Sequence, residues 1–295
     1  MGKDFYDALP AARDVFDRAD QILGMDLKKL CFDGPDDRLN QTDMSQPAIF
    51  VTSVACFMAA QDAGAIQPEH VTAHAGLSLG EYTALHLAGS ISFEDGLKLV
   101  AARGKYMQQA ATANPSGMVA IAGADENAAI QLCEQNAQGE VLVPANFNAP
   151  GQIVLSGSSS ACERVARAAE AAGFKAFPLK VAGAFHSPLM QSAAARMAAE
   201  LERVEIKPPQ TAVYSNVTAE PHTDAASIRK LLVQQIVRPV RWEQTMQKLA
   251  PQADARFVEL APGRVLTGLL KKINRRLPIE SLATADALKP KVSQM

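Results

Sequence analysis

The sequence has few of the features that mark a membrane, secreted or nucleic-acid-binding protein. Its longest apolar runs, such as AIFVTSVACFMAA, are too short and too rich in alanine to cross a bilayer. Its first residues, MGKDFYDALP, lack the apolar core of a secretory signal. The formal net charge is −2, which gives no electrostatic reason to bind nucleic acid or a membrane surface. We expect a cytoplasmic protein without nucleic-acid or membrane partners, and we expect a monomer.

Cysteine is also scarce. The four cysteines stand far apart at positions 31, 56, 133 and 162, and no CxxC or Cys/His ligand spacing occurs. Reduced structural thiols are therefore expected rather than disulfides or metal ligands. The sequence predicts no metal site and no bound cofactor.

The apolar pattern predicts an α/β fold with a small subdomain inserted into a larger one. Residues 117–182 read as strand, helix, strand, strand, helix, strand, which is typical of a ferredoxin-like βαββαβ unit. The flanking segments 1–116 and 183–295 predict helices, among them 9–23 and 46–64 with Pro47 in the first turn of the second, and buried strands. We expect the two flanks to form one discontinuous catalytic subdomain, α/β-hydrolase-like with a parallel sheet.

A G-x-S-x-G pattern places Ser78 between Gly76 and Gly80 in HAGLSLGEYTAL. A short predicted strand precedes it and a predicted helix follows, as in a nucleophile elbow, where glycines two residues on either side permit the tight turn. The N–H of Leu79 would then lie at a helix N-terminus and can donate to an oxyanion. The alternative is a buried, hydrogen-bonded serine in a glycine turn.

A serine hydroxyl needs a base to become a nucleophile, and the chain has five histidines. His186, in VAGAFHSPLM, lies in a loop that leads straight into a predicted helix with Ser187 as its N-cap, which fixes the backbone as a base requires. A capping or core histidine is the alternative. The other four lie beside the serine or in polar loops expected to be exposed: His74, His86, His70 and His222.

Arg103, in VAARGKYMQ, lies on the predicted helix after the one that follows Ser78, with apolar or small residues along one side. A guanidinium in such a place needs a carboxylate partner. That partner is either an acidic residue of the protein or the carboxylate of a substrate held by two parallel hydrogen bonds.

Six blocks of the sequence, in order, resemble one family of enzymes. The blocks are GLSLGEYTAL, RGKYMQ, NFNAPGQIVLSG, GAFHSPLM, RPVRW and APGRVLTGL, and they span nearly the whole chain. Together they resemble the malonyl-CoA:acyl-carrier-protein transacylases, the acyltransferases of fatty acid and polyketide synthesis. The resemblance implies malonyl-CoA and acyl carrier protein as partners, and no cofactor besides the phosphopantetheine that the carrier brings.

The resemblance also implies a role for each candidate residue. Ser78 would attack the thioester in a ping-pong reaction, His186 would act as acid and base, and Arg103 would pair with the malonyl carboxylate. The position that matches the family's histidine-orienting main-chain carbonyl is Gln235. Phe185, before the histidine, resembles the malonyl-type pattern, since its volume would crowd an α-methyl group. The remaining family positions line the cleft between the subdomains: Asn146, Asn148 and Asn216.

The sequence departs from the family pattern in two places. Leu77 stands where many members have histidine. Members also begin with a strand and an F-P-G-Q-G-x-Q motif whose glutamine contributes to the oxyanion site, whereas this sequence starts at MGKDFY. A misplaced start codon, a truncation or a variant that fills the gap otherwise would each explain this. An N-terminally extended form is expected to be more active and more stable.

Two other functions stay open at this point, and one surface suggests a partner. A serine esterase or acyl hydrolase would use Ser78 and His186 with water as acceptor, although it would gain nothing from Arg103. A form that binds carrier protein with impaired turnover is the other. One basic stretch can steer an acidic carrier or be only a solvated helix face: Arg264, Lys271, Lys272, Arg275 and Arg276.

Overall fold

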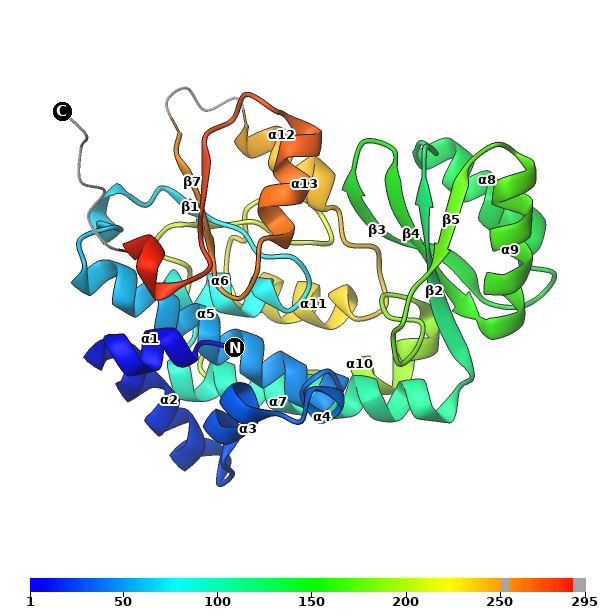
Figure 1. The fold of residues 1–295 in the computed structure, drawn as a ribbon. Coiled ribbons are helices and arrows are strands. Elements are labelled where there is room, and N and C mark those ends of the chain that lie inside the picture. The colour runs from blue at the N-terminus through cyan, green and yellow to red at the C-terminus, as the bar shows by residue number, and fades with distance from the viewer. Residues whose placement is uncertain (251–254, 289–295) are drawn as a thin grey trace.

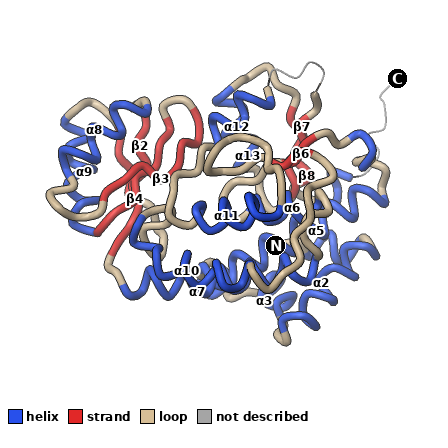
Figure 2. The backbone as a smooth tube through the Cα atoms, turned by 180° about the vertical axis from the view of Figure 1, so that it is seen from behind, coloured by secondary structure: helices blue, strands red, loops and turns tan. Residues whose placement is uncertain are grey.

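The computed structural model describes residues 1–250 and 255–288, which fold into a large helical part and a small part built on a sheet (Figure 1). Figure 2 shows the strands gathered in two places, in the small part and beside the C-terminal helices of the large part. Within the described ranges, no helix combines the length and the apolar character needed to span a bilayer.

Helices dominate the large subdomain. They are α1 (Lys3–Ala8), α2 (Pro10–Leu23), α3 (Leu27–Asp33), α4 (Asp36–Leu39), α5 (Thr42–Asp62), α6 (Gly80–Leu87), α7 (Phe93–Ala113), α10 (Gln191–Leu201), α11 (Ala225–Gln235), α12 (Trp242–Leu249) and α13 (Val265–Ile273). Short 3₁₀ turns are η1 (Pro68–His70), η2 (Pro188–Met190) and η3 (Ala285–Leu288). The long helices α5 and α7 pack side by side and bury a shared apolar core.

Helix α5 begins four residues earlier than the sequence predicts, so Pro47 lies inside the helix rather than in its first turn. Two contacts extend the helix toward its N-terminus. The carboxylate of Asp43 pairs with Arg38 at 2.7 Å, and the N–H of Thr42 donates to the Gln108 side-chain oxygen at 3.1 Å. Acidic residues in a first turn and satisfied N-terminal N–H groups both stabilise a helix start.

The expected parallel sheet is present as two short parallel pairs. Strand β1 (Ala73–His74) pairs with β6 (Ala212–Val213), and β7 (Phe257–Leu260) pairs with β8 (Ile279–Leu282). Among the residues described, no ladder joins one pair to the other. Residues of β1 and β7 instead face a common cavity of about 670 Å³. The prediction of an α/β fold with parallel pairing is thus confirmed, and the parallel strands form two separate pairs.

The small subdomain has the predicted ferredoxin-like arrangement. Its elements in chain order are β2 (Ser116–Ala122), α8 (Glu126–Asn136), β3 (Leu142–Ala149), β4 (Gln152–Ser158), α9 (Ser159–Ala171) and β5 (Lys175–Pro178). The sheet is antiparallel in the order β3-β4-β2-β5, and both helices cover one face (Figure 1). The boundaries at 117 and 182 stay a prediction.

The junction between the two subdomains positions the candidate site. A parallel bridge joins Asn146 of β3 to Val240 just before α12, and α13 packs against β3. The segment from β5 to η2 returns the chain to the large subdomain and places Phe185 and His186 at this junction. A cavity of about 500 Å³ opens there, with walls from both subdomains.

Candidate active site

Ser78 occupies a tight turn between β1 and α6. Its φ of 52° lies in the left-handed region, which is uncommon for a residue with a side chain and points to a strained, functional turn. A Cβ on Gly76 would lie 2.0 Å from the carbonyl carbon and oxygen of Gly80, so position 76 must be glycine. A Cβ on Gly80 would meet nothing within 4 Å. Only the first of the two predicted glycines is therefore a steric requirement.

His186 lies beside this serine. Its Nε2 is 2.8 Å from Ser78 Oγ, and its Nδ1 is 2.6 Å from the main-chain oxygen of Gln235. A carbonyl only accepts, so Nδ1 is the protonated nitrogen and Nε2 is free to accept the serine proton. The backbone of His186 is held at φ 58°, and the predicted N-cap Ser187 bonds to the N–H of Leu189 at the start of η2.

Arg103 reaches the same serine from the middle of α7. Its Nη2 is 2.9 Å from Ser78 Oγ and 2.8 Å from Gln235 Oε1, and its Nη1 donates to Gln46 Oε1 at 2.6 Å. The side chain is 1% exposed, yet within the described ranges no carboxylate forms an ion pair with it. Amide and hydroxyl oxygens thus hold the cation, and its charge stays available to a bound anion.

Burial sets the protonation state of the site. Removal from water lowers the pKa of His186 to about 4, and the nearby charge of Arg103 lowers it in the same direction. The imidazole is therefore neutral at pH 7, the form that accepts a proton. Burial also lowers the pKa of Arg103 from its usual range.

The cavity in front of Ser78 offers space and one N–H donor. Leu79 lies at the start of α6, and its N–H makes no hydrogen bond to another described residue. Such a free N–H beside a nucleophile is suited to an oxyanion. Both Ser78 and Leu79 line the 500 Å³ cavity, as do residues of β3, of the segment between β5 and η2, and of α13: Asn146, Asn148, Phe185, Val265 and Leu269.

Comparison with known proteins agrees with this geometry. The family described as "Acyl transferase domain" matches residues 1–295. The chain belongs to this acyl transferase family. It is 40% identical over 288 residues to the malonyl CoA-acyl carrier protein transacylase of Bacillus subtilis, with 97% of this chain and 89% of that protein covered. It is 41% identical over 286 residues to the transacylase of the same description from Salmonella typhimurium, with 97% and 92% covered.

Solved structures give the same result. The malonyl CoA-acyl carrier protein transacylase of Coxiella burnetii matches this acyl transferase with a TM-score of 0.94 at 38% identity, covering 98% of this chain and 90% of that one. A malonyl-transacylase in complex with its type II PKS acyl-carrier protein matches with a TM-score of 0.93 at 39% identity, covering 98% and 93%.

The structure of this acyl transferase places the asparagines expected in the cleft in two different settings. Asn146 and Asn148 line the cavity. Asn216 does not, which corrects the expectation: it is 1% exposed and lies beneath the elbow. Its side chain accepts from the N–H of Ser78 at 2.6 Å and donates to the oxygen of Gly76 at 2.8 Å. An asparagine can satisfy both groups of one turn because it has a donor and an acceptor.

Three buried residues of the site were not found from the sequence. Gln46 holds Arg103 from α5, and its only signal is a polar residue beside a proline in an apolar helix. His222 was expected to be exposed but is 7% exposed, and its Nε2 is 2.8 Å from Glu81 Oε1. Glu81 itself is fully buried directly after the G-x-S-x-G pattern. A carboxylate or imidazole in a short polar segment gives no local sign of burial.

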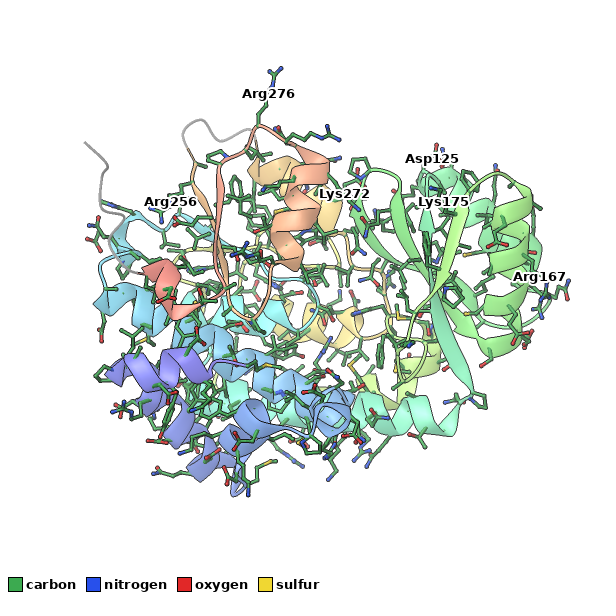
Figure 3. All side chains as sticks on the ribbon, in the orientation of Figure 1. Asp125, Arg167, Lys175, Arg256, Lys272 and Arg276 are labelled. Atoms are coloured by element: carbon green, nitrogen blue, oxygen red, sulfur yellow. The ribbon has the colours of Figure 1, made fainter. Side chains whose placement is uncertain are left out.

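The basic stretch lies next to the cavity mouth. Its five residues are exposed and flank or lie on α13, the helix that supplies Val265 and Leu269 to the cavity wall. Figure 3 shows Lys272 and Arg276 projecting at this end of the molecule. Lys272 Nζ donates to Gln152 of the small subdomain at 2.6 Å. Lys271 lies beside it, and none of the described contacts gives it a partner.

Proposed function

We propose that this acyl transferase moves a malonyl group from malonyl-CoA to the phosphopantetheine thiol of an acyl carrier protein through an ester on Ser78. The observation that supports this most directly is the double contact of Ser78 Oγ, 2.8 Å from His186 Nε2 and 2.9 Å from Arg103 Nη2. The first contact provides a base for a nucleophile, and the second provides a buried cation at the place where the acyl group would be bound.

In the first half-reaction Ser78 Oγ attacks the thioester carbonyl carbon as its proton passes to His186 Nε2. The developing oxyanion accepts from the N–H of Leu79. When the intermediate collapses, the C–S bond breaks and His186 returns the proton to the leaving thiolate. The products are the malonyl-serine ester and free CoA thiol, and His186 is neutral again.

The second half-reaction runs in the opposite sense. His186 takes the proton of the carrier thiol and the sulfur attacks the ester carbonyl. When this intermediate collapses, the C–O bond to Ser78 breaks and His186 gives the proton to Ser78 Oγ. The Gln235 carbonyl keeps the ring in one tautomer throughout, so no acidic third member is needed. A thioester is already activated and the reactive thiol belongs to the carrier, so the chemistry requires no cofactor bound to this chain.

Arg103 supports malonyl as the acyl group. A buried guanidinium favours a group that brings its own carboxylate, while a neutral acyl chain leaves the charge unpaired at a cost. Phe185 borders the same cavity and packs against a small apolar cluster that contains Met118 and Val154, so its ring limits the room for an α-branched acyl group.

Intact mass spectrometry tests the proposal. Wild type, Ser78→Ala and the control Ser160→Ala, an exposed serine of α9, are exposed to malonyl-CoA and then to carrier protein. A malonyl adduct is expected on wild type and Ser160→Ala only, and carrier protein should remove it as malonyl-carrier. An adduct on Ser78→Ala would refute the nucleophile. Release as free malonate whether or not carrier is present would instead indicate an acyl hydrolase.

A further inference from the structure

Glu81 is a wholly buried carboxylate three residues after Ser78, and the reaction described above does not use it. It lies in the first turn of α6 and accepts three hydrogen bonds. Oε2 accepts from the main-chain N–H of Asn216 at 3.0 Å and from Gln235 Nε2 at 2.7 Å, and Oε1 accepts from His222 Nε2 at 2.8 Å. A buried carboxylate needs such donors, because an unpaired one would be very costly.

Two of these donors belong to residues that touch the reacting groups. Asn216 accepts from the Ser78 N–H at 2.6 Å and so holds the elbow. Gln235 contacts Ser78, His186 and Arg103 with three different atoms, at 2.8, 2.6 and 2.8 Å. One carboxylate therefore anchors both residues that hold the nucleophile, the base and the cation in place.

Glu81 fixes the orientation of the side-chain amide of Gln235. Its Nε2 has two hydrogens, and these go to Glu81 Oε2 and to the main-chain oxygen of Ser78. Its Oε1 must then face Arg103 Nη2. A reversed amide would place its NH₂ group against the guanidinium and its oxygen against the carboxylate. The negative charge of Glu81 thus selects the one orientation in which Gln235 can hold Arg103.

The side-chain amide of Gln235 also lies between two buried charged groups, the guanidinium of Arg103 and the carboxylate of Glu81. Arg103 has no direct carboxylate partner in the described part of the chain, and one residue, Gln235, hydrogen-bonds to both Arg103 and Glu81. A direct ion pair would occupy the guanidinium. A carboxylate one residue removed offsets part of its charge without an ion pair, and Arg103 Nε is left without a hydrogen-bond partner among the described residues.

We propose that Glu81 is a positioning residue for acylation, acting through Gln235 and Asn216 to hold Arg103, Ser78 and the histidine-orienting carbonyl in their working geometry. The inference rests on the proposed function, because its readout is acylation of Ser78. His222 holds the second oxygen of the Glu81 carboxylate, Oε1, in place. Neither Glu81 nor His222 lines the cavity, so neither touches the acyl group.

Glu259 offers a matched control for a purely structural role. It is also buried, at 5% exposure, and it accepts two main-chain N–H bonds, from Leu266 at 2.7 Å and Thr267 at 2.8 Å at the start of α13. It has no contact with Ser78, Arg103 or His186 among those described. Glu259→Gln should therefore lower stability as a buried carboxylate does, while acylation keeps its rate.

The experiment measures single-turnover acylation of Ser78 by malonyl-CoA in wild type, Glu81→Gln and Glu259→Gln, beside the Tm of each. Glu81→Gln is expected to lower the rate constant at saturating malonyl-CoA on the order of 10–100-fold, while half-saturation changes little. Glu259→Gln should stay within about threefold of wild type, the range of a neutral change. Acylation of Ser78 in the wild-type protein tests the proposed function separately. If the wild-type protein is not acylated by malonyl-CoA, the proposed function is refuted, whereas the role of Glu81 is judged from the variants relative to wild type.

A second pair of variants decides the matter if Glu81→Gln does not fold. His222→Gln keeps an N–H donor for Glu81 Oε1, whereas His222→Leu removes it. The glutamine variant should retain the acylation rate and the leucine variant should lose about tenfold. The proposal is overturned if Glu81→Gln acylates within about threefold of wild type, or if both His222 variants acylate at the wild-type rate.

Discussion

The guanidinium of Arg103 donates directly to the hydroxyl of Ser78, with Nη2 2.9 Å from Oγ. This contact engages one lone pair of the hydroxyl oxygen, while the hydroxyl proton points to His186 Nε2 at 2.8 Å. An incoming carboxylate that pairs with the guanidinium would compete for this N–H and release a lone pair of the nucleophile. Binding of the acyl group and readiness of the serine are thus linked through one side chain.

The first prediction concerns acyl selectivity at Arg103. Arg103→Ala should raise the activation free energy that corresponds to kcat/KM for malonyl-CoA by about 2–5 kcal/mol, because truncating one partner of a buried charge pair costs about that much. The kcat/KM for acetyl-CoA should change much less. Competition assays with the two thioesters measure the ratio. Arg164→Ala, which breaks an ion pair with Glu140 on the small subdomain, serves as the control. An equal loss for both thioesters would contradict the assigned role.

The second prediction concerns pH. The pKa of His186 lies at about 4, below the usual histidine value, so the base is neutral and active at neutral pH and is lost only as pH falls toward 4. The acid limb of kcat/KM should therefore lie near that value. Arg103→Ala removes a charge that lowers this pKa, so the limb should move to higher pH. A limb that stays in place or moves lower would show that Arg103 does not act on His186.

The third prediction concerns branched acyl groups. Phe185→Ala should raise the ratio of methylmalonyl to malonyl transfer by about 10–200-fold, the range that one methyl group in an apolar pocket allows. The ring borders the cavity, and its removal leaves room for an α-methyl group. Phe177→Ala, at a residue that is 53% exposed, is the control. An unchanged ratio would mean that another wall limits the acyl group.

The fourth prediction separates the two glycines of the elbow. Gly76→Ala would force a Cβ to 2.0 Å from Gly80 and should destabilise the fold by at least about 1–3 kcal/mol, the cost of overpacking. Gly80→Ala meets no atom within 4 Å and should leave Tm unchanged or raised, since alanine favours a helix. Thermal unfolding of both variants tests this. Equal losses would show that the turn tolerates no side chain at either position.

The fifth prediction concerns the carrier protein. Reversing the charge of Lys271 and Lys272 should slow malonyl transfer to carrier protein at low salt and leave acylation by malonyl-CoA unchanged, because opposite charges raise association rates and salt screens them. Arg167→Glu, on an exposed residue of α9 at the far end of the small subdomain (Figure 3), is the control. A change confined to acylation would exclude this stretch as a docking surface.

Local patterns in the sequence determined the elements that depend on neighbours along the chain. The alternation over β2 to β5 predicted the small subdomain, and the strand, G-x-S-x-G turn and helix predicted the elbow. Helix α2 agrees with its prediction because its apolar period and closing Gly24 are local features. The family resemblance is also a property of the sequence, since six ordered blocks span the chain.

Only the tertiary structure decided how the buried polar groups are paired. It shows that Arg103 is held by amide oxygens and not by a carboxylate, that His222 is buried on Glu81, and that Asn216 supports the elbow instead of the cleft. The partners are far apart in sequence, 132 residues for Arg103 and Gln235 and 141 for Glu81 and His222. Hydrogen bonds act over about 3 Å, so the folded chain alone determines which distant groups meet.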